Sequence, residues 1–235
     1  MLLSIKNIDV LYDDFQVIWD MSLDVKKGEM VALLGPNGSG KSTILNTISN
    51  LISHKNGNIN FNEKLISKLP TYERTKIGIS HVLERRRVFP HLTVLQNLLL
   101  GAWHEKAKKV REKSLQEVYE IFPKLKIRSN QLASTMSGGE QQMLAIARGL
   151  MGLPKLLMVD EPFLGLSPLV VKDLIKIFKN IVGNGISILF VEQNVRLALS
   201  MADRGYVLES GRLVVDGYSK DLINNDKVKK VFLGN

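Results

Sequence analysis

The sequence of 235 residues predicts an α/β protein: a core built on a largely parallel sheet, with an N-terminal antiparallel β lobe and an inserted helical subdomain. Three observations predict this architecture. Short, continuously apolar segments alternate with amphipathic helix patterns, as in parallel sheets covered on both faces. A segment near the N-terminus alternates apolar and other residues, as in an antiparallel sheet with one buried face. A long, helix-like stretch separates two of the apolar segments.

The antiparallel lobe is predicted from residues 17–25 and from a second short strand. In the first segment the apolar side chains at every second position are Val17, Trp19, Met21, Leu23 and Val25. Such a period of two places them on one face of a strand, which we expect to be the buried face. The pair Asn56 and Gly57 is a turn signal, and Ile59 and Phe61 continue the alternation after it.

Three short apolar segments, residues 30–34, 156–159 and 186–191, are predicted to be parallel strands of the core. A helix is predicted between the last two. We expect Ser167 to be its N-cap, with a proline in its first turn, and Gly183 to end it. This order of strand, helix and strand implies right-handed crossovers.

The helical subdomain is predicted over residues 90–152. The apolar strands that end at Leu34 and Asp160 are separated by far more than one strand–helix–strand unit of about 30 residues. Much of the intervening sequence has the spacing of amphipathic helices. We therefore expect residues 1–89 and 153–235 to form the core with its β lobe, and residues 90–152 to form the inserted unit.

Composition excludes several classes of protein. The chain is 45% hydrophobic and 23% charged, too apolar for a disordered protein. It has no cysteine, which excludes disulfides, thiolate zinc sites and thiol nucleophiles. No apolar run approaches the roughly 18 residues of a membrane span, and no signal peptide is recognisable. We therefore expect a cytosolic chain that reaches a membrane through a partner. The net charge of +9 is compatible with phosphate-bearing ligands, anionic lipid or nucleic acid, or simply with a basic surface.

A phosphate-binding loop is the strongest chemical signal. It follows the first buried strand and consists of Gly35, Pro36, Asn37, Gly38, Ser39, Gly40, Lys41, Ser42 and Thr43. The segment matches G-x-x-x-x-G-K-[ST], and a helix with apolar positions Ile44, Leu45, Ile48 and Leu51 follows it. Glycines let backbone N–H groups surround an anion at the helix N-terminus. The pattern predicts a P-loop NTPase (RecA-like) core, in which Lys41 contacts the β- and γ-phosphates and Ser42 binds Mg²⁺.

Two acidic residues end a buried strand of this core. Asp160 is placed to hold Mg²⁺, and the adjacent Glu161 to polarise an attacking water as a general base. The alternative is that both acids only cap the following helix.

A second anion-binding signal lies in the helical subdomain. Ser137 and Glu140 form a capping box at a helix start, which alone explains their spacing. Gly138 and Gly139, however, are unfavourable in a first helical turn, by roughly 1 kcal/mol each relative to alanine. Bare backbone at a helix N-terminus suits close approach to an anion.

Together these motifs resemble the ATP-binding cassette (ABC) transporter ATPases over nearly the whole chain. The resemblance implies the ABC ATPase fold, ATP and Mg²⁺ as ligands, and a head-to-tail dimer. It also implies that Ser137, Gly138, Gly139 and Glu140 complete the ATP site of the other subunit in trans. Tyr12 matches the family's adenine-stacking aromatic residue, although an ordinary strand-end tyrosine is the alternative.

Two positions depart from the general family pattern. Glu84 replaces the glutamine that contacts Mg²⁺ and water, and Gln193 replaces the switch histidine. A carboxylate is still an oxygen ligand, and an amide still donates to a γ-phosphate oxygen. We therefore expect Glu84 to be a metal-site residue and Gln193 to sense the γ-phosphate alongside the catalytic residues Glu161 and Lys41.

These departures, with the residues around them, resemble the LivF-type ATPase of branched-chain amino-acid importers. Leu83 and Arg85 differ from that subtype. The resemblance implies a peripheral subunit on the cytoplasmic face of the cell membrane, with no transmembrane segment of its own. Its partners would be transmembrane permease subunits that contact residues 84–90, a sister ATPase or a second copy, and indirectly a solute-binding protein.

Other functions remain open at this level. Importers of urea or amides are similar to the LivF type. The positive charge suggests a nucleic-acid-associated ABC ATPase, but no second cassette, long coiled coil or base-stacking motif accompanies it, and nucleic acid is an unlikely partner. A kinase or GTPase with the same phosphate loop would not need the segment at Ser137. A non-catalytic regulatory cassette is the remaining alternative, because of Glu84 and Gln193.

Overall fold

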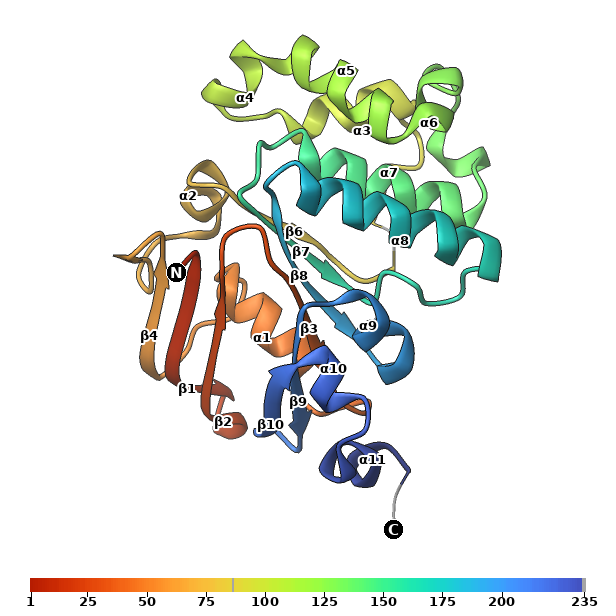
Figure 1. The fold of residues 1–235 in the computed structure, drawn as a ribbon. Coiled ribbons are helices and arrows are strands. Elements are labelled where there is room, and N and C mark those ends of the chain that lie inside the picture. Colours follow the sequence, from red (N-terminus) through yellow and green to blue (C-terminus); the bar gives the residue numbers. More distant parts are fainter. Residues whose placement is uncertain (86, 234–235) are drawn as a thin grey trace.

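The structure, a computed structural model, describes residues 1–85 and 87–233. Its two sheets lie side by side with a helix between them, and a group of helices extends beyond one end of the larger sheet (Figure 1). Among the described residues, no helix is both long enough and apolar enough to cross a membrane.

The smaller sheet is antiparallel and has the strand order β2-β1-β4-β5. Its strands are β1 (Leu3–Tyr12), β2 (Phe15–Val25), β4 (Asn56–Phe61) and β5 (Lys64–Leu65). The larger sheet has the order β10-β9-β3-β8-β7-β6, in which only β10 runs antiparallel to its neighbour. Its strands are β3 (Met30–Leu34), β6 (Ile79–Val82), β7 (Leu156–Asp160), β8 (Ser187–Glu192), β9 (Arg204–Glu209) and β10 (Arg212–Tyr218). The antiparallel lobe and the three predicted parallel strands are therefore present.

The predicted buried face of β2 is correct for only part of the strand. Asp20 has a positive φ of 47°, and the pairing of β1 with β2 shifts register beside it. Such a bulge adds one residue and reverses the side-chain alternation. Ile18 is consequently buried in place of Val17 and Trp19, which are only half-buried, whereas the prediction holds from Met21 onward.

The predicted turn at Asn56 and Gly57 is wrong. Both residues are the first two of β4, and Asn56 pairs with Asp9 of β1. Gly57 has a φ of 82°, and a Cβ there would collide with the backbone of Asn7. The glycine therefore serves a bulge where two strands approach closely, and the sequence signal for a bulge is the same as that for a turn.

Helices cover both faces of the larger sheet, and those of the core are α1 (Lys41–Ile48), α2 (Thr71–Lys76), α8 (Pro168–Gly183), α9 (Val195–Met201), α10 (Ser219–Leu222) and α11 (Asp226–Leu233). Helix α1 lies between the two sheets, where Ile44, Leu45 and Ile48 share one apolar cluster with strands of both. Leu51, predicted on the same helix face, lies beyond the helix and is 52% exposed.

Helix α8 begins at the predicted proline with Ser167 as the N-cap, although the serine side chain makes no capping hydrogen bond. Gly183 is the last residue of the helix. The positive φ that ends the segment belongs to Gly185, at 85°. The predicted end of the helix at Gly183 is therefore confirmed, and Gly185 supplies the left-handed turn that follows it.

Between β6 and β7 the regular structure is helical: α3 (Val94–Gly101), α4 (Glu105–Lys109), α5 (Arg111–Ile121), α6 (Pro123–Ile127), a 3₁₀ turn (Ala133–Thr135) and α7 (Gly138–Leu150). Helices α3 to α6 form the outer group in Figure 1. Helix α7 connects them to the sheet, where Gly149 lies against side chains of β6 and β7. The division into separate units at residues 90 and 152 stays a prediction.

Arg74 of α2 fixes the C-terminal end of α1. Its guanidinium is 1% exposed and donates to the carbonyl oxygens of Thr47 and Ile48 at 2.9 and 2.8 Å, and also to those of Leu69 and Ser67. Burial lowers the pKa of Arg74 to about 10, so it remains charged at neutral pH. The cation therefore satisfies the last carbonyls of the helix that carries the phosphate loop.

Candidate ATP site

A cavity of about 500 Å³ lies at the N-terminal end of α1. It is lined by Val17, Asn37, Gly38, Gly40, Lys41, Ser42, Thr43, Glu84, Glu161, Leu164 and Gln193. Most of the lining comes from the phosphate loop, from the residues that follow β7 and β8, and from the segment after β6. These segments meet because β3, β7, β8 and β6 end at the same edge of one parallel sheet.

Glycines give the loop its shape. Gly38 and Gly40 have φ values of 77° and 100°, which favour glycine, and Gly40 is the N-cap of α1. At Gly35 a Cβ would collide with Ser39 and with the backbone oxygen of Leu208. The loop therefore passes tightly over the sheet with its N–H groups at the start of a helix, as an anion cradle requires.

Lys41 is the first residue of α1 and is 5% exposed. Its Nζ donates to the carbonyl oxygens of Gly35 and Pro36 at 2.8 and 2.9 Å. Burial lowers the pKa of Lys41, and the carboxylates of Glu161 and Asp160 partly oppose this effect. The ammonium is thus held inside its own loop, at the place where phosphate oxygens would be bound.

Asp160 is the last residue of β7 and is 5% exposed. Burial raises the pKa of Asp160 to about 6, the carboxylates of Glu161 and Glu84 act in the same direction, and a hydrogen bond with Ser42 opposes them. Its Oδ1 is buried without a hydrogen-bond partner. An unpaired carboxylate oxygen beside a hydroxyl is a fitting environment for Mg²⁺. The described residues contain no group of three or more metal-ligating side chains, but Mg²⁺ commonly takes one or two carboxylates together with substrate phosphates.

Glu161 and Gln193 are in direct contact across the cavity. Gln193 Nε2 donates to Glu161 Oε1 at 2.6 Å. Glu161 has a positive φ of 44°, and its N–H donates to the carbonyl oxygen of Val191 at 3.2 Å. The backbone at Glu161 is thus in a conformation that side chains rarely adopt, and the carboxylate contacts Gln193. Two of the three predicted catalytic residues, Glu161 and Gln193, therefore lie together, although 32 positions separate them in sequence.

Sequence reasoning missed Glu192, which organises this edge of the sheet. Its carboxylate is 6% exposed and accepts hydrogen bonds from the N–H groups of Phe163 at 3.2 Å and Gln193 at 3.1 Å. Burial raises the pKa of Glu192, and these bonds oppose that effect. The available signal was an acidic residue at the end of an apolar strand, the same pattern that identified Asp160.

Glu84 reaches the cavity from the segment after β6. Its side chain is 40% exposed and forms an ion pair with Arg85, whose Nε lies 3.5 Å from Glu84 Oε1. Arg85 has a φ of 64°. The neighbouring Arg86 lies outside the described residues. Glu84 is thus close enough to Asp160 to raise the pKa of that carboxyl, but it is more exposed than Asp160.

Tyr12 ends β1, next to the loop but outside the cavity lining. Its hydroxyl lies 3.4 Å from Thr43 Oγ1, and its side chain is 46% exposed. Phe15, its partner across the β1–β2 pair, is 73% exposed. Tyr12 therefore lies beside the phosphate loop with an exposed ring, and its role towards adenine stays a prediction.

Ser137, Gly138, Gly139 and Glu140 do not line this cavity. They form the start of α7 and are engaged with one another. Ser137 Oγ and N both donate to Glu140 Oε2, at 2.9 and 3.0 Å, and Arg128 Nε lies 3.0 Å from Glu140 Oε1. A Cβ at Gly139 would collide with Val170 of α8, which explains this glycine by packing.

A hollow of about 330 Å³ lies between α2, α3, α7 and β6. Phe89, Leu100 and Trp103 line it and are 49, 45 and 41% exposed. The guanidinium of Arg148 lies 5.1 Å from the centre of the Phe89 ring and donates to the carbonyl oxygen of Arg87 at 2.6 Å. We call this hollow the aromatic groove. Phe89, one of its lining residues, follows Glu84 by five positions in the chain.

The loop, acids and fold together define an ATP-hydrolysing cassette. Residues 18–164 match the ABC transporter family, and the chain belongs to that family. Among solved structures it is similar to a nucleotide-free ATP-binding cassette from an ABC transporter, with a TM-score of 0.89 and 26% identity over 100% of this chain and 99% of that one. A dimeric structure of a bacterial ABC transporter cassette is also similar, with a TM-score of 0.81 and 26% identity, covering 93 and 99%.

Curated relatives of the chain belong to two kinds of transport system. The chain is 42% identical to the high-affinity branched-chain amino acid transport ATP-binding protein BraG of Pseudomonas aeruginosa, over 99% of this chain and 100% of that protein. It is 34% identical to the lipopolysaccharide export system ATP-binding protein LptB of Haemophilus influenzae, over 99 and 97%. Relatives of both kinds thus match over their full length.

Proposed function

We propose that the chain is the ATP-hydrolysing subunit of an importer of branched-chain or other hydrophobic amino acids. The observation that carries this proposal is the 42% identity to BraG over the full length of both chains. An exporter is the second candidate, because identity to LptB is 34% over a similar length. Importers of urea or amides remain within the same proposal, since the transported substrate is selected by other subunits.

Binding of ATP begins at the phosphate loop. The β- and γ-phosphates replace the carbonyl oxygens of Gly35 and Pro36 as partners of Lys41, while the loop N–H groups and the start of α1 hold the remaining oxygens. Tyr12 stacks on the adenine, and its exposed ring beside Thr43 supports this role.

Asp160, Ser42 and Glu84 are the residues that hold Mg²⁺ in this proposal. The unpaired Oδ1 of Asp160 and the hydroxyl of Ser42 supply hard oxygen ligands, and Glu84 supports them from the cavity edge. When bound, Mg²⁺ neutralises charge on the β- and γ-phosphate oxygens.

Hydrolysis depends on Glu161 and Gln193. Glu161 accepts a proton from the attacking water, which approaches in line with the bond to the leaving ADP. Gln193 orients the Glu161 carboxylate through their 2.6 Å hydrogen bond and donates to the γ-phosphate. Lys41 offsets the charge that develops on the transferred group.

The working unit is a dimer with two composite ATP sites. Ser137, Gly138, Gly139 and Glu140 of one subunit bind the γ-phosphate held by the loop of the other. The start of α7 lies outside the cavity lining of its own chain, which supports a role towards a second chain. The partner is a sister ATPase or another copy. The dimer closes on ATP and opens after hydrolysis, and this motion is passed to the permease subunits. The permease subunits dock in the aromatic groove at the cytoplasmic face of the membrane. They receive their ligand from a solute-binding protein.

The decisive experiment uses Glu161→Gln, which preserves the shape of the site but removes the general base. With ATP and Mg²⁺ we expect a stable dimer by size-exclusion chromatography with light scattering, and with ADP a monomer. A monomer under both conditions would contradict the composite site. Co-purification of the tagged chain from its native membrane identifies the pathway: an amino-acid permease supports the importer, and an exporter component contradicts it.

A further inference from the structure

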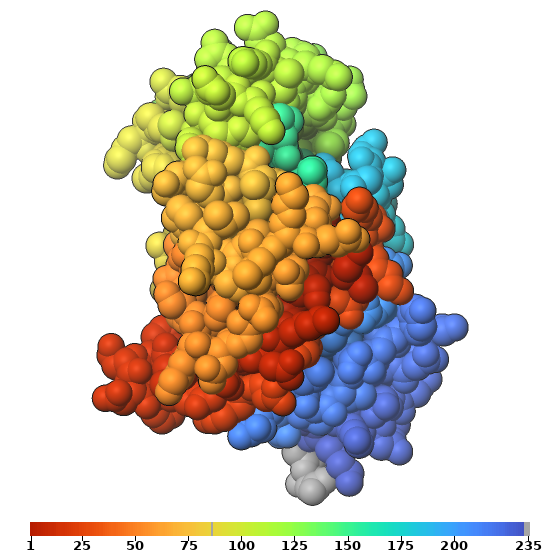
Figure 2. Space-filling view, turned by 90° about the vertical axis from the view of Figure 1, so that its left-hand side faces the viewer, coloured from red at the N-terminus to blue at the C-terminus, as the bar shows by residue number. Residues whose placement is uncertain are grey.

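A second cavity, of about 430 Å³, lies on the side of the molecule that Figure 2 presents. It is formed where β4 and β5, α2, the start of α4 and the residues before β7 meet, and it shares no lining residue with the ATP cavity. Its floor is apolar: Phe61 and Ile66 are buried, and Leu69 and Ile77 are partly buried. Neither the proposed catalysis nor the proposed dimer uses this cavity.

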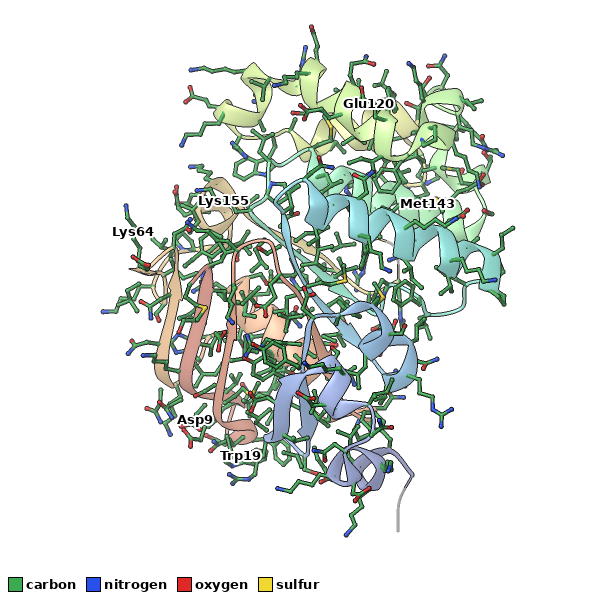
Figure 3. The ribbon with its side chains drawn as sticks, in the orientation of Figure 1. Asp9, Trp19, Lys64, Glu120, Met143 and Lys155 are labelled. Carbon is green, nitrogen blue, oxygen red and sulfur yellow. The ribbon has the colours of Figure 1, made fainter. Side chains whose placement is uncertain are left out.

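Four lysines line the cavity, and each comes from a different segment: Lys64, Lys76, Lys106 and Lys155. All four side chains are exposed. Lys64 and Lys155 lie on the same side of the molecule in Figure 3. No carboxylate is among the lining residues. Tertiary structure thus collects four positive charges that lie far apart in the sequence.

Only one of these lysines is neutralised by an ion pair. Lys76 Nζ lies 2.7 Å from Glu73 Oε1, and Glu105 is also close enough to favour its charged form. In residues 1–85 and 87–233, no salt bridge forms at Lys64, Lys106 or Lys155. The cavity therefore has three lysines without an ion pair among the described residues, and an anionic ligand would neutralise their charge.

The rim of the cavity is apolar as well as basic. Leu65 and Leu153 are 58 and 39% exposed beside the lysines. Lysines next to exposed aliphatic side chains are suited to a ligand with an anionic head and an apolar body. A small hydrophilic anion would leave these leucines in water.

The cavity and the aromatic groove share no lining residue, but three pairs of chain neighbours border both. Lys76 follows Thr75 of the groove, His104 follows Trp103, and Leu153 follows a glycine of the groove. If permease subunits dock in the groove, as proposed above, this neighbouring surface lies towards the bilayer. This orientation is the step that rests on the proposed function.

We infer that this cavity binds the headgroup of an anionic phospholipid. Lys64, Lys106 and Lys155 pair with the headgroup phosphate, and Leu65 and Leu153 contact the adjoining apolar part. The contact gives the chain an attachment to the membrane that is independent of the permease and of ATP.

The test is co-sedimentation of the full chain with vesicles, without nucleotide. We expect it to bind vesicles of phosphatidylcholine with about 30 mol % phosphatidylglycerol, but not pure phosphatidylcholine, at about 0.1 M salt. The triple variant Lys64→Gln, Lys106→Gln, Lys155→Gln should partition about 100-fold more weakly, since each lysine near an anionic surface contributes about fivefold.

The matched control replaces three exposed lysines of α8: Lys172→Gln, Lys176→Gln, Lys179→Gln. It has the same net charge, 9 − 3 = +6, and should partition within about fivefold of the natural chain. Equal loss in both variants would overturn the site, as would no binding to either vesicle. Thermal unfolding of each variant checks that both are folded.

Two soluble probes distinguish binding of a lipid headgroup in this cavity from binding of a free anion. Inorganic phosphate and glycerol 1-phosphate should give no saturable binding by calorimetry in the millimolar range. Binding of either probe that the cavity variant loses would overturn the lipid assignment. The dimer formed by Glu161→Gln with ATP is measured without vesicles, so the proposed function and this inference fail separately.

Discussion

Two helix N-termini in this molecule, those of α1 and α7, carry motifs for binding phosphate, but they differ in how their polar groups are satisfied. At α1, within the described part of the chain, Lys41 donates hydrogen bonds only to its own loop, and Oδ1 of the neighbouring Asp160 has no hydrogen-bond partner. At α7, Ser137 and Glu140 bond to each other, and Arg128 completes the arrangement. The first terminus is arranged for a ligand, whereas the second is already a finished helix cap. A variant at α1 should therefore affect catalysis alone, and one at α7 should affect catalysis and folding together.

The largest expected effect is at α1. Lys41→Ala should lower ATP turnover by about 10³-fold, because it removes the charge that stabilises the transferred phosphate. The free energy of unfolding should change by no more than about 1 kcal/mol, since the cost of burying the ammonium opposes its two hydrogen bonds. Steady-state hydrolysis and urea unfolding measure the two quantities. Turnover within tenfold of the natural chain would remove the loop from the mechanism.

The next effect is at α7. Ser137→Ala should lower turnover about a hundredfold through the loss of a γ-phosphate contact in the dimer, and should lower the free energy of unfolding by about 1 kcal/mol. Thr93→Ala is the matched control. Thr93 and Gln96 form another capping box, at α3, outside the ATP cavity. The control should lose similar stability and keep its turnover; equal turnover in both variants would show that α7 is only a capped helix.

A smaller effect tests the contact between the strand ends. Gln193→Ala removes the hydrogen bond to the Glu161 carboxylate and should lower turnover about tenfold, or about 1.4 kcal/mol, near the lower end for a hydrogen bond to a charged group. Single-turnover kinetics should locate the loss in the chemical step and leave the affinity for ATP unchanged. Equal turnover in Gln193→Ala and the natural chain would reject the role of a γ-phosphate sensor.

The smallest effect is a pH dependence at α7. Burial favours the protonated form of Glu140, but hydrogen bonds from Ser137 and the charge of Arg128 outweigh it and lower the pKa of Glu140 below 4.5. The Glu140 carboxylate therefore binds a proton more readily in the unfolded chain than in the folded chain. This stabilisation is present above about pH 4.5 and is lost as the pH falls through the folded-state pKa. Relative to Glu140→Gln, which keeps the capping box, the natural chain should lose a few tenths of a kcal/mol in acid, since the side chain is partly exposed. Parallel pH profiles in urea unfolding would contradict this.

Local sequence patterns predicted the strands and the helix start around the cavity, whereas the roles of the site residues stay predictions. The phosphate loop, the strand before it and the acids Asp160 and Glu161 all depend on neighbouring residues, whose spacing is readable along the chain. The failures were places where a single residue changes the geometry. The bulge at Asp20 moved Ile18 to the buried face, and Gly57 formed a bulge in place of a turn.

The sequence by itself determined which chemistry this protein can perform, because glycine, lysine and carboxylate positions around one strand–helix turn are fixed within a few residues. Only the tertiary structure decided which distant groups join them. Three features require the assembled sheets: the hydrogen bond from Gln193 to Glu161, the burial of Arg74 against the end of α1, and the presence of Lys64 and Lys155 in one cavity. Such contacts follow from packing between elements far apart in the chain, which leaves no periodic signal in the sequence.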